Sequence, residues 1–535
     1  MCVTLNSLRL YEELELTGGL LRVNGKVAAF TLGEEVSDDT FVVHIEKAFA
    51  EIQGAYPMIN QQFVEHECMK YKYINREEDT GAEGLRKAKL SYRPVFLVEK
   101  GTVTKREGNS MIAEKMKGMV ANSSAIRAMF EEGNRLAKLY GRENVFDFSL
   151  GNPNVEAPEA VKEALISIVK EEAPLELHGY TNSNAGYEEV RQAVAESLNE
   201  RFQTEFCRKY SHDSRCSGRL ECDFKDAYQP QEEVIVFAPY FGEYRSYTSN
   251  VDGVLVEISP DTETFQPKLT EFAEKITPKT KAVIVNTPNN PTGVVYSEKT
   301  IREMARILEE KQKEYGTEIY LISDEPYREL AFDGVEVPYL TKYYKNTIVA
   351  YSYSKSLSLP GERIGYLVIP SEVADSCDVI AAAGVANRIL GFVNAPTLLQ
   401  KVVAKCIREK TDLTYYNRNR ETLYEGLRQC GFSCIKPQGA FYLFVKSPIE
   451  DEKAFCEAAK RYNILLVPGS SFGCPGYVRI AYCVAYETII GALPRFQELA
   501  KQYFRDKLEK HAKVRKRNKI FVNQKRKIEK REDLC

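Results

Sequence analysis

The chain has 535 residues, enough for several domains. Its 44% hydrophobic and 28% charged residues exclude a disordered, collagen-like or disulfide-stapled protein. The formal net charge is −3, but residues 505–535 hold 13 Lys/Arg against 5 Asp/Glu, so this end carries +8 and the rest carries −11. An acidic body disfavours nucleic-acid binding. The basic tail, 503–535, is predicted to be a solvated extension, with binding to RNA or anionic lipid as the alternative.

The cysteine pattern and the absence of targeting signals predict a cytoplasmic protein. The 13 cysteines form no CxxC pair, which fits a reducing compartment, and Cys430 and Cys434 are interpreted as ordinary thiols. No run of about 18 apolar residues predicts a membrane span, and the first residues lack a basic-then-apolar signal. With five scattered histidines, we expect no metal site.

Residues 1–105 are predicted to form strands with two helices. Apolar runs at 20–23 and 27–31 flank Asn24-Gly25, a strong hairpin signal. A further strand is expected at 41–45. Helical spacing covers 54–66 and 84–90, and a closing strand is expected at 94–98.

Three runs in this segment carry a family resemblance: FVVHIEK at 41–47, YINREED at 73–79 and GLRKAKLSYRP at 84–94. They resemble the C-terminal part of the acetyltransferase-like domain of the phosphatidylglycerol lysyltransferase group. The resemblance starts mid-domain, which implies a partial acetyltransferase-like α+β segment. We interpret it as a docking or scaffold fragment, with acyl transfer as the alternative.

Residues 106–502 are predicted to form one α/β unit. Strand-like apolar runs at 234–237, 282–285, 319–322 and 347–351 alternate with helical stretches such as 298–315. This alternation favours a largely parallel sheet covered by helices, whose ligands bind at the carboxyl ends of the strands.

Three polar motifs follow these strands. Lys355 lies in Ser-Tyr-Ser-Lys directly after one strand, where a partly deprotonated amine could form a Schiff base, and Arg363 offers a planar fork for a phosphate. The other two motifs are NTPNNPTG at 286–293 and DEPY at 324–327. Each predicts polar groups at the same sheet edge as Lys355.

These motifs, in this order, resemble the class I aminotransferases of fold type I, which use pyridoxal 5′-phosphate (PLP). The match runs from about residue 111 to 500. It implies a large domain at about 155–375 with a mostly parallel sheet, and a smaller α/β domain from about 110–150 and 376–500.

The resemblance implies a role for each site residue. Lys355 would hold PLP as a Schiff base and move the proton between Cα and the cofactor, and Asp324 would pair with the pyridine nitrogen. Tyr327 and Asn290 would bind the ring's 3-oxygen. The remaining cofactor contacts would be Ser352 and Arg363 to the phosphate, and Phe241 stacked on the ring, with Tyr240 as the alternative.

Substrate and subunit contacts follow from the same resemblance. Arg479 would clamp the substrate α-carboxylate, together with Asn290, and the backbone of Gly151 would lie beside the substrate. Tyr180 would reach the phosphate of the neighbouring subunit, which implies a homodimer with shared sites.

Residues 207–231 depart from the family's pattern. A Gly/Ala-rich turn that opens a helix and binds the phosphate is expected there. The stretch shows neither strand alternation nor a helical face, and a zinc interpretation of its Cys and His residues fails on spacing. When suitable codons for 215–220 are shifted by one base, they encode Gly-Ala-Ala-Gly-Gly, the expected turn. Our hypothesis is a pair of compensating frameshifts near Phe206 and Gln231, as a true lesion or a sequencing error. We expect this charged stretch to loop out and leave the sheet short of a strand.

The sequence therefore predicts an aminotransferase that moves an amino group between an α-amino acid and a 2-oxo acid, with aspartate or glutamate as the substrate. Two alternatives stay open. One is another PLP reaction, such as β-elimination or decarboxylation. The other is a damaged pseudoenzyme that lacks the phosphate turn.

Overall fold

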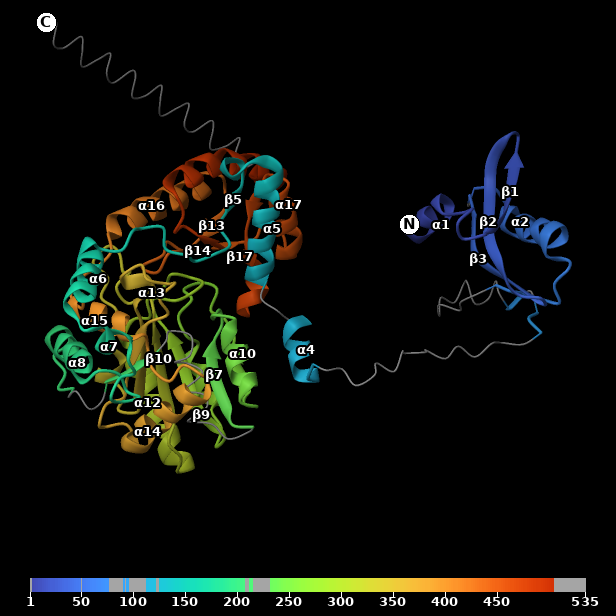
Figure 1. Ribbon diagram of the computed structural model, residues 1–535. Coiled ribbons are helices and arrows are strands. Elements are labelled where there is room, and N and C mark those ends of the chain that lie inside the picture. Colours follow the sequence, from blue (N-terminus) through green and yellow to red (C-terminus); the bar gives the residue numbers. More distant parts are fainter. Residues whose placement is uncertain are drawn as a thin grey trace, which may run out of the picture. The chain divides into compact units, whose positions relative to one another are not determined.

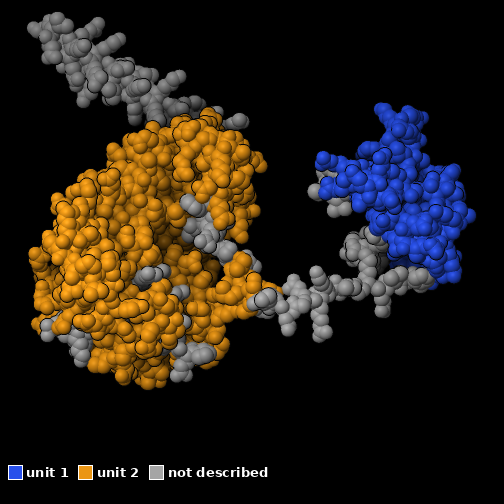
Figure 2. All heavy atoms as spheres, in the orientation of Figure 1, with its two compact units in different colours: residues 1–109 blue, residues 110–535 orange. Residues whose placement is uncertain are grey.

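The chain forms two compact units, Met1–Asn109 and Ser110–Cys535 (Figure 2). The computed structural model describes residues 2–49, 51–76, 90–91, 93–95, 112–121, 125–206, 211–214 and 231–504.

Unit 1 is a four-stranded sheet in the order β1-β2-β3-β4, with α2 packed against it. Asn24 and Gly25 both take positive φ angles, 51° and 79°, so the predicted two-residue hairpin is confirmed. The helix predicted at 54–66 is confirmed as α2, which continues as a π-helical turn. Pro94 and Val95 are not in a strand, and 84–89 lie outside the described residues. The elements are α1 (Cys2–Arg9), β1 (Thr17–Val23), β2 (Lys26–Ser37), β3 (Thr40–Ala48), α2 (Ala55–Phe63), η1 (Val64–Cys68) and β4 (Tyr73–Asn75).

Unit 2 is built around a seven-stranded sheet in the order β6-β12-β11-β10-β9-β7-β8 (Figure 1). The strands from β11 to β8 run parallel, whereas β12 pairs antiparallel with β11 and with β6. The four predicted apolar strands are confirmed as β7, β9, β10 and β11. The strands are β6 (Ser211–Ser214), β7 (Glu233–Phe237), β8 (Val254–Ile258), β9 (Thr280–Asn286), β10 (Tyr320–Glu325), β11 (Thr347–Ser352) and β12 (Gly365–Val368).

Helices cover both faces of this sheet because its buried strands are apolar on both sides. Val234 and Val236 of β7 join one buried cluster, with α10 and α14, whereas Ile235 and Phe237 join another, with α11 and α12. The predicted helix α12 begins at a Ser297 cap and ends at Gly316 in the left-handed conformation. The helices are α6 (Glu159–Glu171), α7 (Pro174–His178), α8 (Glu188–Phe202), α10 (Glu243–Asn250), α11 (Leu269–Lys275), α12 (Glu298–Tyr315), α13 (Tyr353–Ser356), α14 (Ser376–Ile389) and α15 (Thr397–Lys405).

A second sheet, β13-β14-β17-β16, is antiparallel and shares a buried core with α16 and α17. A short parallel pair joins β5 to β15. The elements are α4 (Glu114–Ala121), α5 (Ala125–Tyr140), η2 (Arg142–Asn144), β5 (Phe146–Asp147), η3 (Leu340–Lys342), α16 (Leu413–Gln429), β13 (Ser433–Cys434), β14 (Tyr442–Lys446), α17 (Glu452–Lys460), β15 (Ile464–Leu465), β16 (Val467–Pro468), η4 (Gly469–Phe472) and β17 (Tyr477–Ala481).

The expectation that the 207–231 stretch would leave the sheet short of a strand is wrong. Residues 211–214 form β6, which pairs with β12 over four residue pairs, from Ser214 opposite Gly365 to Ser211 opposite Val368. The pairing uses main-chain groups, which a polar sequence offers as readily as an apolar one. Residues 207–210 and 215–230 lie outside the described residues.

Candidate active site

The polar motifs predicted to meet at one sheet edge do follow neighbouring parallel strands. Asn286 ends β9 and lies opposite Asp324 near the end of β10, and β11 ends at Ser352, three residues before Lys355. Because the carboxyl ends of parallel strands share one edge, these side chains gather on that edge.

Lys355 is held beside Gly151, which lies 204 positions earlier in the chain. It lies in the single-turn helix α13, where the Ser352 hydroxyl accepts a hydrogen bond from the Ser354 amide at 3.0 Å. The Lys355 Nζ donates to the Gly151 carbonyl oxygen at 2.6 Å and lies 5.3 Å from the centre of the Phe441 ring. The ammonium group is therefore fixed against the backbone of Gly151.

Asp324 receives a hydrogen bond from a residue that the sequence did not identify. The Tyr244 hydroxyl, on α10, donates to Asp324 Oδ2 at 2.6 Å. Burial, and then the Asp324 carboxylate, raise the pKa of Tyr244 well above its usual value, so this tyrosine stays a donor. The Asn286 side chain donates to the Asp324 carbonyl oxygen at 2.9 Å and fixes the backbone there.

Arg479 is a buried cation among neutral groups. Its side chain is 2% exposed, and it donates to Asn290 Oδ1 at 3.1 Å and to the Ser149 carbonyl oxygen. The Tyr442 and Phe472 rings lie 4.6 and 4.8 Å from its Cζ. Burial lowers the pKa of Arg479. Within the described residues no carboxylate pairs with it, and its Nε has no hydrogen-bond partner, so its positive charge is not balanced by an anionic side chain there.

A closed circuit of contacts joins the predicted residues. The Tyr327 and Tyr442 hydroxyls lie 2.9 Å apart, and the Tyr442 ring contacts Arg479. Arg479 donates to the side-chain oxygen of Asn290, and the backbone N–H of Asn290 donates to Asn286 Oδ1 at 2.7 Å. Asn286 in turn donates to the carbonyl oxygen of Asp324, three residues before Tyr327. The chain of contacts therefore begins and ends in the turn that follows β10.

Ser352 and Arg363 are brought together by the pairing of β11 with β12. Ser352 lies opposite Gly365, two residues after Arg363. Arg363 is half-buried with a φ of 56°, and its guanidinium donates to the Pro360 carbonyl oxygen at 2.8 Å. A hydroxyl and a guanidinium at this corner offer the donors that a phosphate needs.

The three remaining predicted residues lie in different settings. Phe241 is half-buried, and its ring meets Tyr244 edge-on at 5.7 Å, whereas Tyr240 is buried and stacks on Tyr244 at 6.3 Å. Gly151 accepts from Lys355. Tyr180 is 88% exposed, so its predicted place beside a neighbouring subunit stays a prediction.

Two contributors were missed by the sequence reasoning, Tyr244 and Tyr442. Tyr244 follows Tyr240 by four residues on the first turn of a helix, and this helical spacing after Ala-Pro-Tyr-Phe could have pointed to it. Tyr442 begins a strand directly after Gly-Ala-Phe, and no local pattern there indicates a partner 115 residues away.

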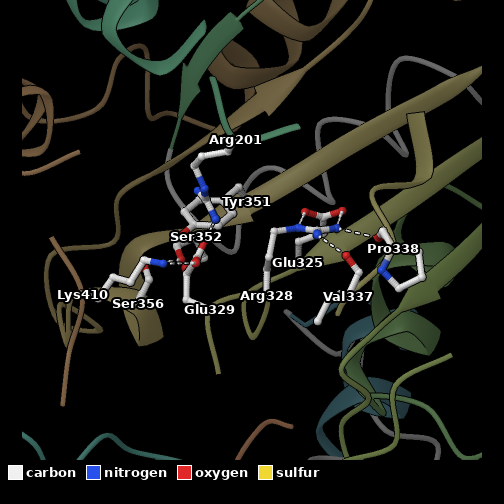
Figure 3. Close-up of polar contacts among 10 residues, drawn as sticks. All are labelled: Arg201, Glu325, Arg328, Glu329, Val337, Pro338, Tyr351, Ser352, Ser356 and Lys410. Carbon is white, nitrogen blue, oxygen red and sulfur yellow. Dashed lines mark hydrogen bonds and ion pairs between the residues drawn. The ribbon is translucent and has the colours of Figure 1, made fainter. Parts of the chain in front are cut away.

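The carboxylate next to Asp324 lies in a contrasting setting (Figure 3). Glu325 and Arg328 form an ion pair with side chains 1% and 4% exposed, and Arg328 also donates to the Val337 and Pro338 carbonyl oxygens, both at 3.0 Å. Nearby, Glu329 binds Arg201 and lies 3.9 Å from Lys410. Each of these two carboxylates has a cationic partner within the fold.

The family model for aminotransferases of class I and II matches residues 143–493. The chain belongs to this family, whose members use PLP. A crystallised amino transferase from Eubacterium rectale is 45% identical, with a TM-score of 0.72, covering 74% of this chain and 99% of that one. The aspartate aminotransferase of Thermus thermophilus with maleate is 27% identical, with a TM-score of 0.64, covering 72% and 99%. Aromatic-amino-acid aminotransferase 2 of Thermococcus litoralis is 30% identical over 72% of this chain and 97% of its own length.

The N-terminal resemblance is confirmed as well. Residues 1–102 match the family model described as phosphatidylglycerol lysyltransferase, C-terminal. Among the helices of the described residues, none combines the length and apolar character that crossing a membrane requires.

Proposed function

We propose that this aminotransferase binds PLP at the edge formed by β9, β10 and β11 and transfers the amino group of aspartate or glutamate to a 2-oxo acid. The observation that carries the proposal is Arg479, a buried guanidinium with no carboxylate partner among the described residues, lying in one contact circuit with Asn290 and Tyr327. A buried cation in such a setting requires an anion, and a substrate carboxylate supplies one in bidentate geometry.

The donor set of the site fits PLP. A carboxylate, Asp324, matches a protonated pyridine nitrogen, and hydroxyl and amide groups of Tyr327 and Asn290 match a phenolic oxygen. Ser352 and Arg363 lie together at the corner where a phosphate would be held. Lys355 supplies the primary amine.

When bound, PLP supplies an aldehyde that condenses with amines and a ring that accepts an electron pair. Lys355 would hold the cofactor and, once displaced by the substrate amine, would move the proton between the substrate Cα and C4′ of the cofactor. Asp324, fixed by Tyr244, would keep the ring nitrogen protonated. Arg479 and Asn290 would orient the substrate through its α-carboxylate, so that its Cα faces Lys355.

Aspartate and glutamate are proposed because relatives in this family carry the name aspartate aminotransferase. The aromatic relative from Thermococcus litoralis makes tyrosine and phenylalanine the informative competitors. A homodimer is proposed as well, supported by two large apolar side chains at α7 and after it: Leu175 is 89% exposed and Tyr180 is 88% exposed.

The test is a panel of amino donors with 2-oxoglutarate or oxaloacetate as acceptor, with the new amino acid and the new 2-oxo acid both quantified. We expect stoichiometric transfer with aspartate or glutamate. Release of ammonia or carbon dioxide instead would identify elimination or decarboxylation, and faster transfer from tyrosine would overturn the acidic substrate. Light scattering during size-exclusion chromatography tests the dimer.

The alternative of a damaged pseudoenzyme concerns residues 207–231. Absorbance titration with PLP, on the chain as given and on a version carrying the frame-restored segment, separates the possibilities. We expect tighter PLP binding by the frame-restored version, because the restored turn adds amide donors to the phosphate. Equal affinity and equal melting temperature would show that the segment is tolerated, and the coding DNA would decide whether the frameshifts are real.

A further inference from the structure

Tyr442 contacts two of the proposed site residues with one side chain. It begins β14 and is 3% exposed. Its hydroxyl lies 2.9 Å from the Tyr327 hydroxyl, and its ring lies 4.6 Å from the Arg479 guanidinium. Arg479 pairs with Phe444 across β14 and β17, so Tyr442 is its diagonal neighbour on that sheet. The Tyr442 hydroxyl thus connects the second sheet of unit 2 with Tyr327 in the turn after β10.

The backbone of residue 151 closes the other side of this hydroxyl. A Cβ atom added to Gly151 would lie 1.9 Å from the Tyr442 hydroxyl oxygen, which no real structure permits. The same Gly151 accepts a hydrogen bond from Lys355. The Tyr442 hydroxyl is therefore confined between the backbone of Gly151 and the hydroxyl of Tyr327.

The two hydroxyls carry two protons but share one hydrogen bond, so one O–H is left for another acceptor. Burial raises the pKa of Tyr442 to about 12 and raises the pKa of Tyr327 well above its usual value, so both hydroxyls keep their protons. The deprotonated 3-oxygen of bound PLP would need a donor, and Tyr327 is the hydroxyl proposed to face it. Where Tyr327 donates to that oxygen, the hydrogen bond between the two hydroxyls must be donated by Tyr442.

We propose that Tyr442 is a positioning residue: its hydroxyl donates to Tyr327 and thereby leaves the Tyr327 O–H as a donor to the 3-oxygen of bound PLP. This inference rests on the proposed function, since Tyr327 must face the cofactor for its proton to matter. The titratable groups that face Tyr442 are Tyr327, Arg479 and Cys483, and the Cys483 thiol is neutral because burial raises its pKa to about 12.

The experiment follows the visible absorption of PLP bound to the whole protein as a function of pH, without substrate. A donor to the 3-oxygen stabilises the deprotonated chromophore, so its loss moves the protonation midpoint upward. We expect Tyr327→Phe to raise the midpoint and Tyr442→Phe to raise it by roughly 0.5–1 pH unit, the size of one neutral hydrogen bond. Because Tyr442 acts through Tyr327, the double variant should match Tyr327→Phe alone.

Tyr482→Phe is the matched control. It removes a buried hydroxyl from the same core, one that donates to the Ala440 carbonyl oxygen at 3.1 Å, and it should leave the midpoint unchanged. Melting temperatures of Tyr442→Phe and Tyr482→Phe show whether both variants fold alike. An unshifted Tyr442→Phe beside a shifted Tyr327→Phe would overturn the role of Tyr442 alone. An unshifted Tyr327→Phe would instead overturn the proposed role of Tyr327 itself.

Discussion

Asp324 and Glu325 are consecutive carboxylates at the end of β10, yet the fold treats them in opposite ways. Glu325 is enclosed with Arg328, which also binds two backbone carbonyl groups, and the Ser323 hydroxyl donates to it at 2.7 Å. Asp324 faces the site edge, where the neutral hydroxyl of Tyr244 binds it. Glu325 therefore has its countercharge, Arg328, within the protein. Asp324 accepts a hydrogen bond from a neutral hydroxyl.

Under the proposed function, this difference separates an ion pair that is complete within the fold from a carboxylate that takes part in the chemistry. A buried ion pair that is complete in the protein leaves neither charge for a ligand, and removing one partner leaves the other charge buried without compensation. A carboxylate oriented by a neutral donor keeps its negative charge for a cation, such as a protonated ring nitrogen. Substitutions on the two sides of β10 should therefore affect different measurements.

The largest effect is expected at the site edge, from Lys355→Ala. The variant should lose the visible absorption band of bound PLP, and turnover should fall on the order of 10⁴-fold or more, because both the covalent attachment and the proton transfer are removed. Its melting temperature without PLP should stay close to that of the parent. Lys410→Ala, at an exposed lysine near Glu329, is the control and should keep both colour and rate.

Asp324→Asn keeps the shape of the side chain and removes its negative charge. Transamination should slow on the order of 10²–10⁴-fold while PLP still binds, because the ring nitrogen loses its anionic partner. Glu325→Gln is the matched variant on the other side of the strand, and it should lower stability with an unchanged rate per folded molecule. Equal rates for Asp324→Asn and the parent would contradict the pairing with the ring.

Arg328→Met leaves the Glu325 carboxylate buried without its cation. We expect a loss of about 3–5 kcal/mol in the free energy of unfolding, measured by denaturant titration, with kcat per folded molecule unchanged. Arg408→Met removes an ion pair whose side chains are 75% and 63% exposed, so it should cost less than about 1 kcal/mol. A similar cost for both variants would show that the Glu325 pair contributes little.

The smallest effect is expected from Tyr244→Phe, which removes the hydroxyl that binds Asp324. The net value of one hydrogen bond to a charged group is about 1.5–3 kcal/mol, so kcat/KM should fall roughly 10- to 100-fold. Tyr344→Phe removes a buried hydroxyl that binds Gln312 and should leave kcat/KM unchanged. If both variants keep full activity, Tyr244 does not position Asp324.

The sequence was sufficient for the strands and for the motifs that follow them. Lys355, Asp324 and Asn290 each lie within four residues of the end of an apolar strand, and parallel strands bring such positions to one edge by geometry alone. The fold type was therefore predictable, and the family match confirms it.

Tertiary partners were not predictable in the same way. Tyr244 meets Asp324 across 80 residues and Tyr442 meets Tyr327 across 115. Helical spacing from Tyr240 points to Tyr244 but not to its partner, and nothing local marks Tyr442. The error at 211–214 had another cause. The interpretation considered side chains alone, whereas a strand at the edge of a sheet is held by its backbone.

The pairing of β6 with β12 has a consequence for how the gene can vary. Amide and carbonyl groups are the same for every residue except proline, so this edge selects chain direction and length more than amino-acid identity. A substitution in β6 should therefore disturb the pairing less than one in an interior strand such as β10. In the interior strands a changed side chain also alters the packing of both faces, whereas at this edge the pairing groups of the backbone stay in place.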